Sequence, residues 1–227
     1  MSGATSMVRH IVSSVLFLAL FGACLFVPAG TLDWPMAWVV LATFGVLAGA
    51  AVAFLDPELL RQREAIERGS KPWDPPLAMG GFVFLIALPL VFSGWDVRYT
   101  GGVSPIGPIA RSVAFVLFVA GQAFGLWAMR VNRFFAKFVR IQHERGHRVV
   151  TGGPYAIVRH LGYAGGIVSY VALPVALGSW RGALVACVGG VLFVVRTRLE
   201  DRVLQAELDG YRDYAARVRW RLVPGLW

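Results

Sequence analysis

The sequence predicts an all-α fold, a polytopic integral membrane bundle of about five or six transmembrane helices with amphipathic helices at the interface. Composition is the first observation: 57% of the 227 residues are hydrophobic and 15% are charged, against about a quarter charged in soluble domains. Length is the second, because several apolar runs reach the roughly 20 residues that a bilayer-crossing helix needs. The third is that the charges gather between these runs.

The apolar runs give the transmembrane helices in chain order. We predict four single spans and a closing helical hairpin, over residues 11–29, 34–55, 77–94 and 112–129 and then 161–178 and 182–195. The first run follows Arg9 as a signal peptide would, but it continues past Cys24 and is longer than the apolar core of such a peptide. It is therefore predicted to be a transmembrane helix.

Amphipathic helices are predicted where apolar and charged residues mix at helical spacing between the spans. In the 56–76 loop, Leu59 and Ile66 stand among charges, and the helix is expected to end at Gly69. A basic continuation of the fourth span is predicted from Phe134, Phe135, Phe138 and Ile141. Interfacial helices separated at Gly210 are predicted in the C-terminal tail from Leu199, Val203, Leu204, Leu208, Tyr211 and Val218.

The first half of the chain has the features of a scaffold. Small residues four apart let membrane helices approach closely, and such pairs are Gly45/Gly49, Gly121/Gly125 and Gly162/Gly166. The polar residues that could carry chemistry follow in the second half.

Basic charge is distributed asymmetrically. Of the 22 Lys and Arg residues, all but Arg98, Arg111 and Arg181 fall in the N-terminus, the 56–76 loop, the 130–160 segment and the C-terminal tail. The positive-inside rule places these segments in the cytoplasm, so both termini are predicted to be cytoplasmic, in a plasma (inner) membrane. This topology, with attraction to anionic lipid headgroups, accounts for the net charge of +9 and argues against nucleic-acid binding.

Ionisable residues crowd at the start of the hairpin, in the segment GPYAIVRHLGYAG. It holds Tyr155, Arg159, His160 and Tyr163. Such groups are costly to hold at a membrane boundary and are functional candidates by default. After the hairpin, the chain leaves the membrane through Arg196, Glu200 and Asp201. Two polar clusters that bracket one hydrophobic hairpin predict the two walls of a single site.

A zinc motif provides an alternative. The segment HERGH matches H-E-x-x-H, which on a helix presents two zinc ligands, here His143 and His147, and a base, here Glu144. A membrane zinc metalloprotease would use this arrangement. However, Gly146 disfavours the helix, the segment is basic, and no third ligand is evident. We therefore expect no metal site.

Residues 130–227 resemble the isoprenylcysteine carboxyl methyltransferase family, which is related to the membrane phospholipid N-methyltransferases. The family pattern is G-x-Y-x-x-x-R-H-P-x-Y-x-G, an apolar hairpin and then R-x-x-x-E-E, and both blocks occur here in order. The chain departs from it at Leu161, where the family has Pro, and at Asp201, where it has the second Glu. The apolar runs predict a four-helix transmembrane scaffold over 1–129, and the resemblance implies a methyltransferase-like catalytic region over 130–227, within one structural unit.

The resemblance also implies an S-adenosylmethionine site at the cytoplasmic face. The implied cofactor-binding residues are Gln142, His147, Val150, Gly153, Tyr155, His160, Tyr163, Glu200 and Asp201. The implied residues for acceptor binding and catalysis are Arg159, Arg196 and Glu200. Carboxylates suit the ammonium or ribose, ring faces suit the sulfonium or adenine, and an arginine would orient an acceptor carboxylate. Arg196 and Glu200, four apart on one helix face, are expected to form a polarised pair.

The sequence leaves the methyl acceptor open. The resemblance favours an isoprenylcysteine-type carboxylate, and a phospholipid or a small amine or thiol is an alternative. A non-enzymatic scaffold or transporter is a further alternative, but transporters carry ionisable residues near the membrane centre, where Gln122 is here nearly the only polar side chain. The expected partners are membrane lipids and a lipophilic acceptor, with no nucleic acid, and the oligomeric state stays open.

Overall fold

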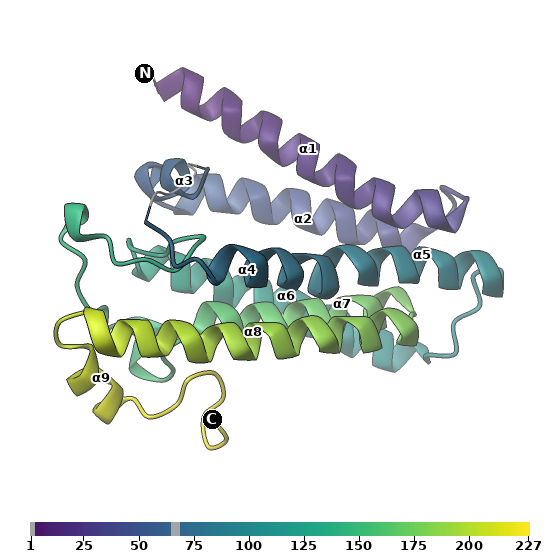
Figure 1. The fold of residues 1–227 in the computed structure, drawn as a ribbon. Coiled ribbons are helices and arrows are strands. Elements are labelled where there is room, and N and C mark those ends of the chain that lie inside the picture. Colours follow the sequence, from purple (N-terminus) through teal and green to yellow (C-terminus); the bar gives the residue numbers. More distant parts are fainter. Residues whose placement is uncertain (1–2, 65–68) are drawn as a thin grey trace.

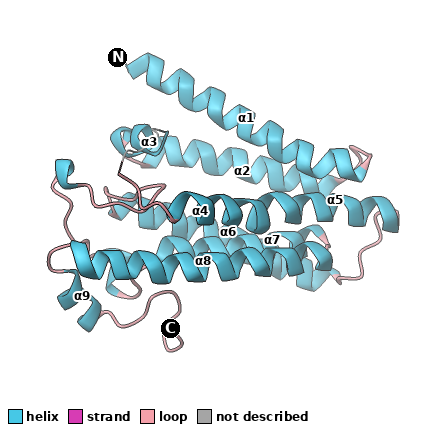
Figure 2. Cartoon of the chain, in the orientation of Figure 1, coloured by secondary structure: helices cyan, strands magenta, loops and turns pink. Residues whose placement is uncertain are grey.

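The computed structural model describes residues 3–64 and 69–227. Over these ranges it contains helices and connecting loops but no strands, which confirms the predicted fold class (Figures 1 and 2). The long helices are α1 (Gly3–Ala29), α2 (Pro35–Phe54), α6 (Pro108–Val131), α7 (Leu161–Leu177) and α8 (Trp180–Glu207). One further span joins α4 (Asp74–Phe82), a π-helical turn η1 (Val83–Ala87) and α5 (Leu88–Thr100). The short helices are α3 (Pro57–Glu64), η2 (His143–Arg145), η3 (Gly153–Ala156) and α9 (Tyr211–Arg217).

Five helical segments of the described chain are long and apolar enough to cross a membrane, and α7 is a shorter apolar helix. The predicted spans are all present, with different ends. The third extends over Asp74–Thr100 rather than 77–94, and its π-helical turn precedes Pro89, which has no N–H to donate to the helix. The last predicted span, α8, continues to Glu207, well beyond the predicted end at residue 195.

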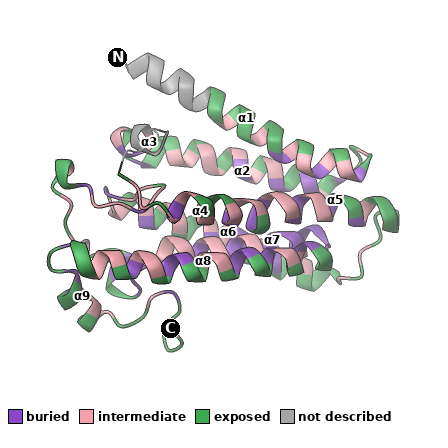
Figure 3. Cartoon of the chain, in the orientation of Figure 1, coloured by how far each residue is buried: buried purple, intermediate pink, exposed green. Residues whose placement is uncertain are grey.

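The helices lie side by side in a bundle in which α6 packs on α7, α8 contacts α5 and α7, and α1 contacts α5 and α2. Large apolar side chains such as Leu16, Val46 and Val191 remain exposed, as expected for contact with lipid. Exposed positions occur along the long helices of the bundle (Figure 3). The N-terminus, α3, the start of α4 and α9 all lie at one end of the bundle (Figure 1). The basic segments therefore share one end, as the predicted topology requires.

Glycine sets the close crossing of α6 and α7. A Cβ on Gly121 would lie 2.9 Å from the backbone nitrogen of Ser169 and still closer to the Gly165 carbonyl oxygen, so only hydrogen fits. The predicted pairs do not act as pairs, because a Cβ on Gly49, Gly125 or Gly166 would meet nothing within 4 Å. The four-residue spacing thus correctly marked Gly121 as a point of close contact, but its contacts are Gly165 and Ser169 of α7 and do not involve Gly125.

Two predicted amphipathic helices are wrong in form. Residues 132–142 are not helical, because the chain turns at Asn132, whose Oδ1 accepts the N–H of Phe134 (2.9 Å), and then runs irregularly across the bundle end. The tail from Leu199 to Glu207 continues α8 rather than forming a separate interfacial helix. The break at Gly210 is confirmed by its positive φ of 77°, which ends the turn before α9. In the 56–76 loop, α3 is present with Leu59 buried, whereas Ile66 lies outside the described residues.

Candidate active site

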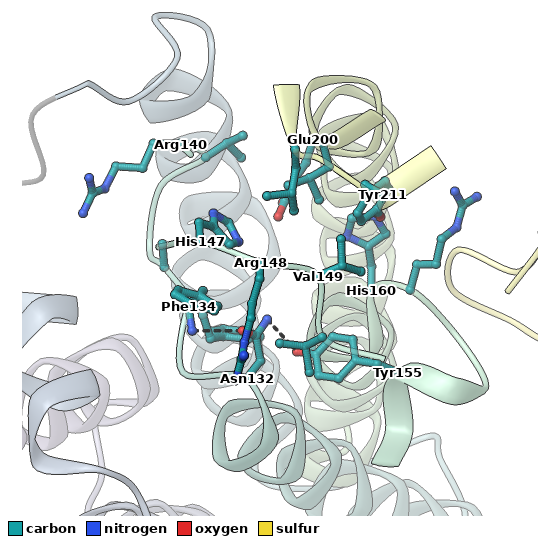
Figure 4. Close-up of a pocket in the computed structure, with 18 of the residues that line it drawn as sticks. Asn132, Phe134, Arg140, His147, Arg148, Val149, Tyr155, His160, Glu200 and Tyr211 are labelled. Atoms are coloured by element: carbon teal, nitrogen blue, oxygen red, sulfur yellow. Dashed lines mark hydrogen bonds between the residues drawn. The ribbon is translucent and has the colours of Figure 1, made fainter. Parts of the chain in front are cut away.

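A cavity opens at the basic end of the bundle. It is lined by the 132–150 segment, by the start of α7, by the last turns of α8 and by α9, and its empty volume is about 840 Å³ including the mouth. Figure 4 shows Phe134 and His147 on one side of the cavity and His160 and Tyr211 on the other. The two polar blocks separated by the hairpin therefore do meet.

The 132–150 segment is held in place by the buried amide of Gln142. Its Nε2 donates to the Phe134 carbonyl oxygen (2.7 Å), and its Oε1 accepts from Arg145. Its backbone N–H donates to Nδ1 of His147 (3.3 Å). Gln142, predicted to bind a cofactor, thus lies behind the cavity lining and shapes the loop that forms the wall.

His147 lines the cavity, with its ring 4.6 Å from that of Phe134. Because Nδ1 accepts a hydrogen bond from Gln142, Nε2 carries the ring hydrogen and is a donor. Burial, helped by the charge of Arg145, lowers the His147 pKa to about 4, so the ring is neutral at physiological pH.

The H-E-x-x-H segment does not form the helix that a zinc protease requires. Only His143–Arg145 forms a single 3-10 turn, and Gly146 then adopts a left-handed conformation. His143 and His147 therefore do not share a helix face. Among the described residues, no group of three or more potential metal ligands comes together.

Tyr155 forms the floor on the α6 side. Its hydroxyl donates to the Ala128 carbonyl oxygen (3.3 Å), and its own carbonyl oxygen accepts from the Tyr214 hydroxyl of α9 (2.7 Å). Burial raises the Tyr155 pKa well above its usual value, so the phenol stays neutral. The bond from Tyr214 links α9 to Tyr155, which lines the cavity.

His160 and Tyr163 stand at the start of α7. Their rings are nearly parallel, with centroids 5.9 Å apart and an angle of 6° between planes. The Tyr163 hydroxyl donates to Oε2 of Glu200, which is the carboxylate that lines the cavity. Leu161, at the position where the family has Pro, is still the first residue of the helix.

Asp201 is fully buried and serves as a hub. Its Oδ1 accepts from Arg159 (2.9 Å) and from the Tyr211 hydroxyl (3.0 Å), and lies 3.3 Å from Nε2 of His160. Its Oδ2 accepts from Arg221 (2.9 Å) and Gln205 (2.8 Å). The predicted cofactor contact is therefore replaced by a structural position behind the lining, because both oxygens are already engaged.

Arg159 connects this hub to the cavity. Its Nη1 pairs with Asp201, and Nη2 donates weakly to the Arg219 carbonyl oxygen (3.4 Å). Its Nε is buried and has no hydrogen-bond partner among the described residues, although the residue lines the cavity. A buried N–H without an acceptor is rare in folded proteins, so this donor suits an anionic ligand.

Arg196 does not form the predicted pair with Glu200. Its guanidinium pairs instead with Asp74 of α4, through Nε (2.6 Å) and Nη2 (3.0 Å). Nη2 also donates to the Lys137 carbonyl oxygen (2.8 Å). Arg196 is outside the cavity lining, and its Nε and Nη2 are engaged by Asp74 and Lys137, so it is not placed to bind an acceptor in the cavity.

Seven of the eleven predicted site residues line the cavity: His147, Val150, Tyr155, Arg159, His160, Tyr163 and Glu200. The other four, Gln142, Gly153, Arg196 and Asp201, lie behind it; Gly153 packs instead towards Val131. Lining residues that sequence reasoning did not select as site residues include Asn132, Phe134, Arg148, Tyr211 and Tyr214. The recurrence of aromatic residues in the 130–141 segment and in the tail was the available signal, and it was interpreted as membrane anchoring.

Comparison with known protein families gives a match. The model of the isoprenylcysteine carboxyl methyltransferase family matches residues 113–206, from the first turns of α6 almost to the end of α8. No curated protein matches the chain. The matched range contains both polar blocks and leaves out α1 to α5 and α9.

Proposed function

On the match over residues 113–206, we propose that the chain is a member of the isoprenylcysteine carboxyl methyltransferase family and that it uses S-adenosylmethionine to methylate the carboxylate of a lipid-linked acceptor. The family match and the apolar helices support a membrane protein of a methyltransferase family. The cofactor, the acceptor, the cytoplasmic orientation of the site and the membrane-lipid environment are the proposal. The observation that carries it is a cavity lined by both Glu200 and Arg159, whose buried Nε has no hydrogen-bond partner among the described residues.

The lining residues fit S-adenosylmethionine chemically. Glu200 would accept hydrogen bonds from its ammonium or ribose, and the ring faces of Tyr155 and Tyr163 suit its adenine or its sulfonium. The neutral His147 offers Nε2–H as a donor. When bound, the cofactor would supply a methyl group on a positively charged sulfur. The fit supports the proposal because these groups come from two blocks that are far apart in sequence and converge on one cavity.

The charge of the lining favours an anionic acceptor. Among the described lining residues, three carry a guanidinium group, namely Arg140, Arg148 and Arg159, and one carries a carboxylate, Glu200. Arg140 is engaged by Glu144 (2.8 Å), whereas Arg159 retains its buried donor. Because an acceptor carboxylate has no proton to lose, the cavity needs to orient it and exclude water rather than provide a base.

A lateral groove supports a lipid-linked acceptor. It lies between α1 and α2 on one side and α6 and α7 on the other, and its empty volume is about 1,270 Å³ with the open side included. Phe135 and Gly162 line both the groove and the cavity. A ring atom of Phe135 lies 2.6 Å from the position that a Cβ on Gly162 would take, so this contact separates the two spaces. An apolar chain in the groove would bring its polar end to this contact, beside the cavity.

Binding of S-adenosylmethionine to the detergent-purified protein, measured by calorimetry, tests the cofactor. Glu200→Gln should weaken binding about tenfold or more, since hydrogen bonds to charged groups contribute about 1.5–3 kcal/mol. Glu207→Gln is the matched control, because Glu207 lies on the same helix but pairs with Lys71 (2.7 Å) and is outside the cavity lining. Absence of binding by the wild-type protein would refute the proposed cofactor.

Transfer of labelled methyl groups tests the acceptor. We expect label on a prenylated cysteine with a free carboxylate and none on its carboxamide, which has no carboxylate oxygen to accept the methyl group. Arg159→Lys should reduce transfer, because an ammonium cannot reproduce the fixed fork of a guanidinium. Equal labelling of a phospholipid amine would contradict the carboxylate acceptor while leaving the methyltransferase assignment intact.

A further inference from the structure

Asp74 is a buried carboxylate in the part of the chain that carries no predicted chemistry. It is the first residue of α4, its exposure is 0%, and it lies outside the range that matches the family. Nearly all buried carboxylates are paired, so the informative question is what its partners do.

The carboxylate of Asp74 holds the backbone of the cavity wall. Oδ2 accepts the N–H of Val139 (2.8 Å), and both oxygens pair with Arg196. Arg196 in turn donates to the Lys137 carbonyl oxygen (2.8 Å), and the Lys71 N–H donates to the Val139 carbonyl oxygen (3.0 Å). Three backbone groups of residues 137–139 are therefore fixed by the Asp74 turn and its arginine. Phe138 and Val139 line the cavity.

A second set of contacts leads from Asp74 to the cavity carboxylate. The Arg196 guanidinium lies 5.3 Å from the centre of the Tyr163 ring. The hydroxyl of that ring donates to Glu200. The orientation of Arg196 is set by its two hydrogen bonds to Asp74, because a planar guanidinium is fixed by a bidentate contact. The Asp74 carboxylate thus holds the cavity wall at Val139 and also orients Arg196, which lies against the Tyr163 ring that donates to Glu200.

A second buried carboxylate shows what a purely structural pair looks like. Asp96 accepts from Ser179 (2.7 Å) and pairs with Arg181, at the start of α8 and at the opposite end of the bundle. It contacts no residue of the cavity lining by a hydrogen bond. Asp74 has the same kind of partners but adds a direct bond to the cavity wall.

We propose that Asp74 is a positioning residue for the active site, holding residues 137–139 and, through Arg196 and Tyr163, Glu200. Its effect on methyl transfer rests on the proposed function, whereas its effect on the wall does not. The N-terminal half of the chain then contributes to the site through one side chain.

Amide hydrogen exchange in residues 132–142 tests, in the absence of any ligand, whether Asp74 holds the cavity wall. The variant Asp74→Ala/Arg196→Leu removes both charges, which avoids an unpaired buried charge, but leaves the Val139 N–H and the Lys137 carbonyl without their partners. We expect exchange in residues 132–142 to accelerate about tenfold or more relative to the α6–α7 core, a factor that corresponds to about 1.4 kcal/mol. The matched control, Asp96→Ala/Arg181→Leu, should leave exchange there within about twofold of wild type.

Binding of S-adenosylmethionine by the same variants is a second, independent measurement. If the wild-type protein binds S-adenosylmethionine, the Asp74 variant should bind about tenfold more weakly and the Asp96 variant as wild type. If the wild type does not bind, the proposed cofactor fails, and the exchange rates alone decide the role of Asp74. Unchanged exchange in residues 132–142, or equal acceleration in both variants, would overturn the inference.

Discussion

Asp201→Asn should destabilise the protein strongly while leaving the shape of the side chain unchanged. The substitution removes the charge that pairs with Arg159 and Arg221, whose side chains are 4% and 29% exposed. Arg221 can turn towards solvent, but Arg159 stays buried without a counter-charge. Removing one partner of a buried ion pair costs about 3–5 kcal/mol. For a chain of this length each kcal/mol lowers Tm by about 2–4 °C, so we expect a decrease of about 6–20 °C.

Thermal unfolding of the detergent-purified variants provides the assay, with Asp213→Asn as control. Asp213 is an exposed carboxylate in the first turn of α9, and surface substitutions of this kind change stability by about 0.5 kcal/mol or less. If Asp201→Asn lowers Tm no more than Asp213→Asn and yet abolishes binding of S-adenosylmethionine, Asp201 is a direct ligand. The interpretation of Asp201 as a structural hub is then wrong.

Two further outcomes follow from the geometry. Gly121→Ala should destabilise the protein by about 1–3 kcal/mol, because the added Cβ would press on α7. Gly125→Ala, one turn further along α6, should not, because a Cβ there meets nothing within 4 Å. Equal effects of the two substitutions in thermal unfolding would contradict the close crossing of α6 and α7. His147 has a pKa lowered from 6.5 to about 4, so the unfolded chain takes up its proton first as the pH falls. Stability should therefore decrease as pH falls from 6.5 towards 4. His147→Gln should remove this decrease in denaturant titrations and His143→Gln should retain it; a wild-type decrease in His147→Gln would count against the burial of that ring.

Most of the fold could be predicted because a single physical requirement, burial of apolar length in a bilayer, determines it. The spans and the helix break at Gly210 follow from residue type and spacing. The 132–142 segment could not be predicted in the same way. Phe134, Phe138 and Ile141 recur at helical spacing. The backbone there, however, bonds to Asp74 and Arg196, which are remote in sequence. Long-range partners overrode the local pattern.

The site could be predicted at the level of blocks but not of roles. Tyr163 and Glu200 converge as expected because the hairpin returns the chain to the same end. The role of Arg196 was missed because the sequence showed Glu200 one turn away on the same helix face, whereas Asp74 lies 122 positions earlier. The residue type is the same for a side chain that lines the cavity and for one that lies behind the lining. Only the packing of the folded chain shows which position a side chain takes.

The shortness of α7 has a consequence for the depth of the cavity. Its 17 residues extend about 25 Å at 1.5 Å per residue, less than the roughly 30 Å of a bilayer's hydrocarbon layer. The far end is fixed, because Ser104 donates to the Gly178 carbonyl oxygen (2.8 Å). The cavity begins at the other end of the helix, at His160. A hydrocarbon layer of ordinary thickness would therefore extend beyond α7, and it would have to thin locally around this helix to keep the polar groups of the cavity at the level of the headgroups.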